Sequence, residues 1–338
     1  MLLHSTPFKA TCISFAKKPN CSFPLFLAPM EGVGDQSFRK AIASIGGFDE
    51  AVRDFLRVSA QPHLKSLASQ YQHDEIAPVP LAAQLMGSDV TFMAEMAREL
   101  ELKGAPRIDL NCGCPSNTVT GKGAGSSLLK NPQWLYEVAR CMVKAVSIPV
   151  TAKLRSGFED TSLFKENLLA AQESGISYLT LHPRTKLEGY GPPANWELIA
   201  EAKTLLSIPV VGNGDILTVS DALNMVKQTS CDAVMIGRGS IINPFIFQEM
   251  KAHFAGRVYQ PKWSALVRYF EQFFQATPAH IPEKTKINKL KQLLGFFFKS
   301  NEFLLTKRQE ILRFQCDHYS ALLELAYSYI KKSWQKQT

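Results

Sequence analysis

The chain has 338 residues, 46% hydrophobic and 20% charged, so it can bury a full core as one large barrel with an appendage or as two domains. No apolar run reaches the roughly 18 residues of a membrane-spanning helix, which excludes a helical membrane protein. The net charge is +8, and seven cysteines lie widely scattered, an odd number that disfavours a disulfide framework. Such cysteine usage suits a reducing cytoplasm, and we expect a cytoplasmic protein without membrane attachment.

The first 22 residues hold scattered apolar positions broken by Pro7, Lys9 and Lys17, without the continuous apolar segment of a signal peptide. We expect residues 1–22 to form a short, poorly ordered extension. Eight short apolar runs follow, at intervals of roughly 25–35 residues along the chain. They span residues 25–30, 52–58, 80–87, 107–113, 149–155, 178–184, 209–215 and 233–239.

Amphipathic segments with helical spacing separate these runs, as in residues 89–104, 131–146 and 218–229. Strands that are continuously apolar and alternate with helices indicate a parallel sheet covered on both sides. Eight such units favour a closed (β/α)8 barrel over an open sheet, and we assign it to residues 23–250. The run 52–58 is the weakest of the eight, because Arg53, Asp54 and Arg57 interrupt it.

The pattern changes after about residue 250, where helical spacing continues over residues 264–276, 285–300 and 314–334 without further strand candidates. This predicts a separate helical domain over residues 251–338, with residues 253–262 as the linker. Residues 245–338 carry 15 Lys and Arg against 7 Asp and Glu, an excess of 8 that equals the net charge of the whole chain. The asymmetry is that of a polyanion-binding tail or of a solvated basic surface.

Active sites of such barrels lie at the carboxyl ends of the strands. Lys153 is notable there, because an unpaired ammonium inside an apolar strand is costly and needs a buried anion or an electron-rich ring. The polar residues at the predicted strand ends are Met30, Arg57, Gln84, Asn111, Cys114, Lys153, Arg155, His182, Arg184, Asn213, Asp215 and Arg238.

Two glycine-rich turns, "GNGD" (212–215) and "GRGS" (237–240), follow the last two predicted strands. They offer backbone N–H groups and the Arg238 guanidinium to one phosphate, at the place where such barrels often bind one. The phosphate-bearing flavin FMN is the natural occupant. Lys153 and His182 would then hold its ring, although a histidine there can also be a satisfied core residue.

Cys112 and Cys114 in "NCGCPS" could form part of a metal site, a redox pair, or one working thiol with a bystander. No second Cys/His pair follows at zinc-finger spacing, so we expect no metal, and a disulfide across one glycine is sterically awkward. Cys112 is expected to pack as a small hydrophobe. From the residues alone, Cys114 is either an inert core thiol or a working group.

Six segments resemble the motifs of tRNA-dihydrouridine synthases, in order and at the predicted strands. They are "LAPMEGV" (27–33), "LNCGCPS" (110–116), "KLRSG" (153–157), "HPRT" (182–185), "GNGDI" (212–216) and "VMIGRG" (234–239). The resemblance covers about residues 25–338. "FLRV" (55–58), "TKLEGY" (185–190) and "KLKQLL" (289–294) are similar to the bacterial branch that reduces uridine 16.

The resemblance implies a monomeric FMN barrel with a helical tRNA-binding domain, which reduces a flipped-out uridine with electrons from NADPH. Hydride would pass from flavin N5 to C6, and the Cys114 thiol would protonate C5 from the opposite face. A thiol with a pKa near ~8.5 is protonated at neutral pH and can act as an acid. Glycines 121, 123 and 125 would let the following loop close over the base.

The resemblance also assigns residues to FMN and to tRNA. FMN contacts carry over onto Pro29, Met30, Glu31, Gln84, Lys153, His182, Asn213, Gly214, Asp215, Gly237 and Arg238. Asp215 stands where related sequences often have Glu, so its side chain is shorter at this contact. Contacts to the uridine, its neighbours or the tRNA backbone carry over onto Arg57, Asn111, Arg184, Tyr190, Lys289 and Lys291.

Two other functions fit parts of the pattern. A small-molecule FMN oxidoreductase of the dihydroorotate dehydrogenase type shares the barrel, the phosphate site and a catalytic thiol, but it needs no basic tail. A flavin-free RNA-binding protein on the same barrel would be colourless, whereas intact Lys153, His182 and Arg238 predict a yellow protein.

Overall fold

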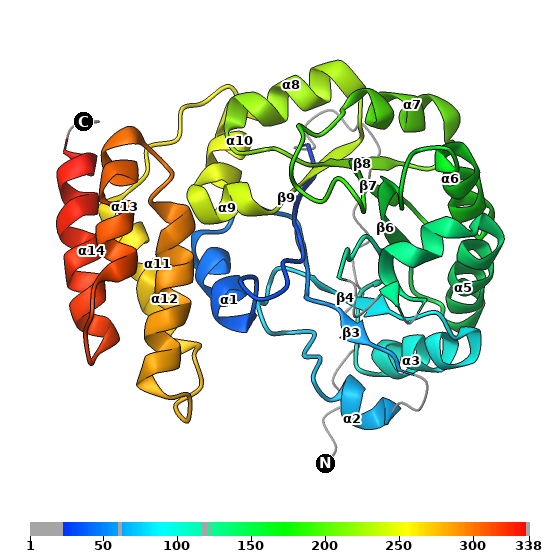
Figure 1. Cartoon of the computed structure of the whole chain (residues 1–338), viewed down its shortest axis with the longest axis horizontal. Coiled ribbons are helices and arrows are strands. Elements are labelled where there is room, and N and C mark those ends of the chain that lie inside the picture. The colour runs from blue at the N-terminus through cyan, green and yellow to red at the C-terminus, as the bar shows by residue number, and fades with distance from the viewer. Residues whose placement is uncertain (1–22, 60–62, 117–119, 122, 336–338) are drawn as a thin grey trace, which may run out of the picture.

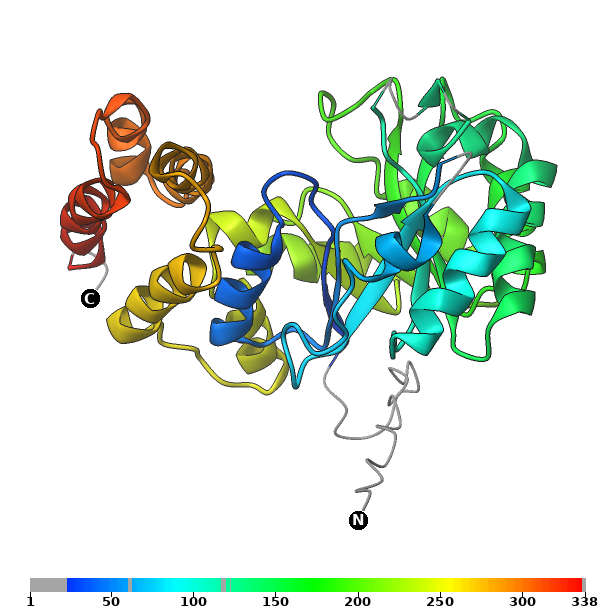
Figure 2. The same cartoon turned by 90° about the horizontal axis from the view of Figure 1, so that it is seen from below.

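The computed structural model describes residues 23–59, 63–116, 120–121 and 123–335. The extension expected over residues 1–22 lies outside this range. A ring of strands with surrounding helices forms one part of the molecule, and a group of helices from the C-terminal quarter stands beside it (Figures 1 and 2).

Within the described residues, nine parallel strands form one closed sheet, in which every adjacent pair is parallel. The ring closes where β1 pairs with both β2 and β9. The strands are β1 Leu25–Leu27, β2 Glu50–Val52, β3 Leu56–Arg57, β4 Leu81–Met86, β5 Ile108–Cys112, β6 Val150–Gly157, β7 Leu179–Thr185, β8 Val210–Asn213 and β9 Ala233–Ile236. Because β2 and β3 both pair with β4, they are two segments of the same strand position, or stave, of the barrel. The nine strands thus occupy eight staves, and the predicted (β/α)8 barrel is confirmed.

The prediction of one continuous strand over residues 52–58 was wrong, because residues 53–55 leave the ladder. Val52 pairs with Ala82 and Leu56 with Leu85, so this stave holds one residue more than its partner between the two pairs. Such a bulge reverses which face later side chains occupy. Val52 therefore lies in the barrel interior, whereas Leu56 packs in the outer core.

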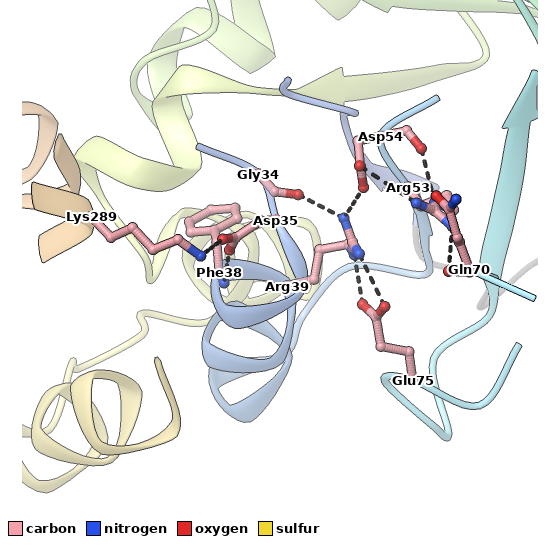
Figure 3. A network of polar contacts seen from close by, with 9 residues as sticks. All are labelled: Gly34, Asp35, Phe38, Arg39, Arg53, Asp54, Gln70, Glu75 and Lys289. Carbon is pink, nitrogen blue, oxygen red and sulfur yellow. Dashed lines mark hydrogen bonds and ion pairs between the residues drawn. The ribbon is translucent and has the colours of Figure 1, made fainter. Parts of the chain in front are cut away.

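The break in this stave is held by charged side chains from three segments (Figure 3). Arg39 on α1 (Gln36–Ile45) is buried and donates to Asp54 at 2.6 Å, to the Gly34 carbonyl at 2.7 Å and to both oxygens of Glu75. Arg53 donates to the Gln70 carbonyl at 2.8 Å. Arg53 and Asp54, two of the charged residues that interrupt the apolar run, thus have buried or half-buried partners where the ladder opens.

Helices cover the outside of the barrel, and several begin at a side-chain cap. Asp35, Asp89 and Asn131 each accept a backbone N–H of the first turn, and Thr218 and Asp221 form a reciprocal capping box. The barrel helices after α1 are α2 Leu64–Ala68, α3 Val90–Leu102, α5 Pro132–Ala145, α6 Phe164–Glu173, α7 Glu197–Leu205, α8 Val219–Thr229, α9 Arg238–Ile242 and α10 Ile246–Phe254, with a 3-10 turn at Gly125–Lys130.

The C-terminal part, as far as residue 335, consists of four helices: α11 Trp263–Gln275, α12 Glu283–Phe297, α13 Glu302–Arg313 and α14 Tyr319–Trp334. The sequence pattern missed α13, because only Leu304 and Ile311 on it are buried, too few for a clear apolar stripe. Helix α11 packs against α1, and Ser37 and Thr277 join their ends by a buried hydroxyl pair at 3.1 Å. Residues 255–262 connect the two parts, close to the predicted linker.

No helix in the described ranges is both long and apolar enough to span a membrane.

Candidate active site

Two adjoining cavities open at the carboxyl ends of the strands, each with a volume of about 110–120 Å³. Four residues line both: Pro29, Lys153, His182 and Tyr190. The thiol cavity is further lined by Glu31, Asp54, Phe55, Gln84, Asn111, Gly113, Cys114, Pro115 and Arg155. The arginine cavity is further lined by Ala28, Met30, Asn213, Gly214, Asp215, Ile216, Leu217, Met235, Gly237, Arg238 and Gly239.

Asp215 organises the arginine cavity. It follows β8 with a φ of +54°, a left-handed conformation that Asp tolerates better than most residues. Its Oδ2 accepts from Arg184 at 2.5 Å and from the Ala194 amide at 2.8 Å, while its Oδ1 lies 3.3 Å from Arg238. The shorter Asp side chain thus reaches two guanidiniums and holds Arg238 at the cavity wall, with 40% of that side chain exposed.

Arg184 is buried and lines neither cavity, so its contact to substrate stays a prediction. Its guanidinium is spent on Asp215, on the Pro192 carbonyl at 2.6 Å and on Nε2 of His182 at 3.2 Å. Because Arg is only a donor, Nε2 of His182 must accept, and the neutral ring carries its proton on Nδ1. Arg184 therefore acts within the wall.

His182 is neutral at physiological pH. Its burial, reinforced by the positive charges of Lys153, Arg155, Arg184 and Arg238, lowers its pKa to about 2. The ring lies in the wall shared by the two cavities, and no hydrogen bond joins its Nδ1–H to another of the described residues.

Lys153 lies between the two cavities and donates to Oδ1 of Asn213 at 3.0 Å. Desolvation lowers its pKa to about 8, the charge of Arg155 acts in the same direction, and that of Asp109 opposes them. Among the residues that the structure describes, no carboxylate forms an ion pair with this amine. The amine is thus a cation at the cavity wall whose partner in the protein is a neutral amide.

Cys114 lines the thiol cavity, whereas Cys112 packs in the hydrophobic core, as predicted. Asn111 Oδ1 accepts the backbone N–H of Gly113 at 3.0 Å and that of Cys114 at 2.9 Å, which fixes the turn carrying the thiol. Burial is the main cause that raises the pKa of Cys114, so the thiol is protonated at neutral pH. The group can therefore donate a proton into the cavity.

Phe55 is a cavity residue that the sequence did not reveal. It lines the thiol cavity and packs against a small cluster of Met86, Cys114 and Ala124. The bulge at residues 53–55 turns Phe55 inward. In an unbroken strand with Val52 facing the interior, residue 55 would face outward. The interruption of the apolar run by charged residues was the available signal.

Arg155 ties together the two loops that flank the cavities. It donates to the carbonyl of Gly113 at 2.8 Å, of Thr185 at 2.9 Å and of Gly189 at 3.0 Å. The following Tyr190 ring is exposed and lies 5.3 Å from the Arg155 guanidinium and 4.9 Å from that of Arg238. The loop thus holds an aromatic face over the boundary between the cavities.

Other predicted residues divide between the site and its surroundings. Glu31 lines the thiol cavity and not the arginine cavity, and Arg57 on β3 is near enough for its charge to act on Cys114. Lys289 on α12 forms an ion pair with Asp35, the cap of α1, and so joins the helical part to the barrel (Figure 3). Lys291 is half-buried and forms no ion pair with any described residue. The loop expected to close over the base includes residues 117–119 and 122, which lie outside the described residues.

The fold and these cavities define a parallel (β/α)8-barrel enzyme with an appended helical bundle. Profile comparison matches residues 26–318 to the dihydrouridine synthase (Dus) family. A tRNA-dihydrouridine(16) synthase of Neisseria meningitidis is 35% identical over 292 residues, covering 83% of this chain and 88% of the relative. One of Shewanella oneidensis is 41% identical over 236 residues, covering 67% and 75%. The chain belongs to the dihydrouridine synthase family, which confirms the resemblance read from the sequence.

A solved structure of histamine dehydrogenase from Rhizobium sp. 4-9 has a TM-score of 0.50 and 15% identity, covering 69% of this chain and 46% of that one. At this identity the likeness shows the shared barrel.

Proposed function

We propose that this enzyme binds FMN and reduces one uridine of tRNA to 5,6-dihydrouridine with NADPH as the electron source. The observation that carries the proposal is the junction of the two cavities. A protonated thiol lines one, Arg238 lines the other, and Lys153 and His182 lie in the wall common to both.

The residues of the arginine cavity fit a flavin phosphate and ring. Arg238 is partly exposed at the wall, beside the glycine-flanked turns 212–215 and 237–240. A Cβ on Gly214 would lie only 2.8 Å from the His182 ring, so glycine lets the backbone approach the histidine there. Lys153, whose partner is an amide, would gain an anionic or electron-rich ring as its partner.

Bound FMN would supply the hydride that reduces the uracil ring. Lys153 and the Nδ1–H of His182 would bind the electron-rich side of the flavin, and Arg238 its phosphate. Cys114 would hold a proton on Sγ until the uracil needs it, because burial keeps the thiol protonated. Asn111, Tyr190, Phe55 and Arg57 would contact or orient the base and its neighbours.

The basic excess of residues 245–338 supports tRNA as the partner, since a free pyrimidine needs no such surface. The names of the relatives support uridine 16 as the target. We further propose that the enzyme acts as a cytoplasmic monomer without a metal.

The purified protein tests these proposals. It should be yellow and release FMN on denaturation, oxidise NADPH, and form dihydrouridine at position 16 in tRNA from a strain lacking the enzyme. A colourless protein that binds tRNA would overturn the flavin assignment. Reduction at another position would overturn only the choice of uridine 16.

A further inference from the structure

A line of hydrogen bonds joins the bottom of the barrel to the turn that carries Cys114. Asp109 Oδ2 accepts from Nε2 of Gln84 at 2.8 Å, and Oε1 of Gln84 accepts from Nδ2 of Asn111 at 2.9 Å. Oδ1 of Asn111 then accepts the backbone N–H groups of Gly113 and Cys114. Three inward-facing side chains on β4 and β5 thus connect a carboxylate to the thiol turn.

The carboxylate of Asp109 sets the direction of the whole line. An ionised carboxylate can only accept, so Gln84 must present its NH2 group to Asp109 and its oxygen to Asn111. Asn111 must then present its own NH2 group to Gln84, which leaves its oxygen for the two amides of the turn. If either amide were reversed, two donors or two acceptors would face each other in the interior.

Asp109 itself is held on its other side. Its Oδ1 accepts from the Thr151 hydroxyl at 2.6 Å and from Arg107 at 3.2 Å, and Arg107 is also paired with Glu50. Asp109 is 1% exposed, Gln84 0% and Asn111 8%, so bulk water has little access to the line, although both amides border the thiol cavity. Because the side chains are buried and each bonds to the next one in the line, the arrangement with these donors and acceptors is favoured over the reversed one.

We propose that Asp109 is a positioning residue for Cys114, which acts by orienting the amides of Gln84 and Asn111 and through them the thiol turn. Asp109 lines neither cavity, so it acts at a distance. The inference rests on the proposed function, because it assumes that the position of the Cys114 thiol matters for proton donation.

Asp109→Asn tests the proposal. Arg107 can only donate, so it keeps the remaining oxygen of residue 109, and the new NH2 group faces Nε2 of Gln84. Two donors then meet, and the line of amides can no longer keep its direction. Arg107 keeps Glu50 as its counter-charge, so the variant should fold. Thr151→Val is the matched control, because it removes a hydrogen bond to the same carboxylate but leaves the line of amides intact.

We expect Asp109→Asn to lower kcat for dihydrouridine formation by about tenfold or more, with KM for tRNA and NADPH oxidation within about twofold of the wild type. Thr151→Val should stay within about twofold in all three. Equal losses in the two variants would overturn the proposal, and so would a normal kcat in Asp109→Asn when Cys114→Ala loses product formation.

Alkylation of Cys114 by iodoacetamide in flavin-free protein, followed by mass spectrometry, gives a readout that needs no reaction. A loosened turn exposes the thiol, so alkylation should be about fivefold faster or more in Asp109→Asn and unchanged in Thr151→Val. Gln84→Met cuts the line one step nearer the thiol without changing charge, and it should show the same acceleration if Asp109→Asn does not fold.

The two readouts separate the proposals. One outcome is faster alkylation in Asp109→Asn together with normal product formation by Cys114→Ala. It would exclude the proton-donor role of Cys114 and leave the orienting role of Asp109 in place. Unchanged alkylation in both Asp109→Asn and Gln84→Met would sink the orienting role by itself.

Discussion

Arg184 donates to Nε2 of His182 at 3.2 Å, and this contact decides which nitrogen of the ring carries the proton. Arg184 also binds Asp215, which in turn holds Arg238. One buried guanidinium therefore orients both the imidazole shared by the cavities and the carboxylate beside the partly exposed arginine. The ligand-facing groups are arranged by a residue that does not face the cavities.

The neutral His182 predicts how stability depends on pH. Its pKa of about 2 in the fold lies below the ordinary value of 6.5, so the unfolded chain binds a proton first as the pH falls. This histidine thus costs stability below pH 6.5, by about 1.4 kcal/mol for each pH unit. Urea unfolding of the flavin-free protein measures this cost. Between pH 6.5 and 5, the free energy of unfolding should fall less in His182→Gln than in the wild type. An equal fall in both proteins would contradict a depressed pKa of His182.

Lys153 predicts how FMN binding depends on pH. With a pKa of about 8, this amine loses its charge in the flavin-free protein as the pH rises through 8. An anionic ligand must then restore the proton, so affinity for FMN should fall by up to about tenfold for each pH unit above 8. Fluorescence titration of the flavin measures this slope. Lys153→Met should bind more weakly at pH 7 and show a flatter dependence, and an equal slope in the variant would assign the titration to another group.

Single substitutions distinguish the roles of Cys114 and Cys112. Cys114→Ala should keep bound flavin and NADPH oxidation but lose dihydrouridine formation by about 100-fold or more, the size of a general-acid contribution. Nucleoside analysis of treated tRNA gives the rate. Cys112→Ala is the control, because Cys112 is fully buried in the core and should affect thermal stability more than product formation. Normal dihydrouridine formation by Cys114→Ala would remove the thiol from the mechanism.

Two lysines of α12 should respond differently to substitution. Lys291 forms no ion pair with the described residues, so Lys291→Ala should weaken tRNA binding and reduce its salt slope by about 1 if it meets a phosphate. Lys289 is paired with Asp35, and losing a partly exposed pair costs about 0–1 kcal/mol of stability. Asp35→Asn keeps the cap acceptor while removing this pair. If Asp35→Asn strengthens tRNA binding, Lys289 also binds the nucleic acid. If tRNA binding does not change, the Lys289–Asp35 ion pair is purely structural.

The sequence predicted much of the barrel because its information is local. Continuous apolar runs separated by helical patterns give the strands and their order, and parallel strands bring all their carboxyl ends to one side. The sequence therefore predicted a common site for Lys153, His182, Cys114 and Arg238. The missed α13 shows the limit of this reasoning, since a helix with two buried side chains leaves little periodic signal.

Which groups satisfy one another was decided by the tertiary structure. Arg184 binds Asp215 and His182, and Lys289 forms an ion pair with Asp35. An extra residue in the second stave places Phe55 beside the thiol. None of these pairings follows from spacing, because each joins segments whose separation in the fold depends on register and packing. The sequence by itself thus determined the strands and the chemistry at their ends. Only the closed barrel, where buried charges must find partners, decided which side chains face the cavities and which hold them in place.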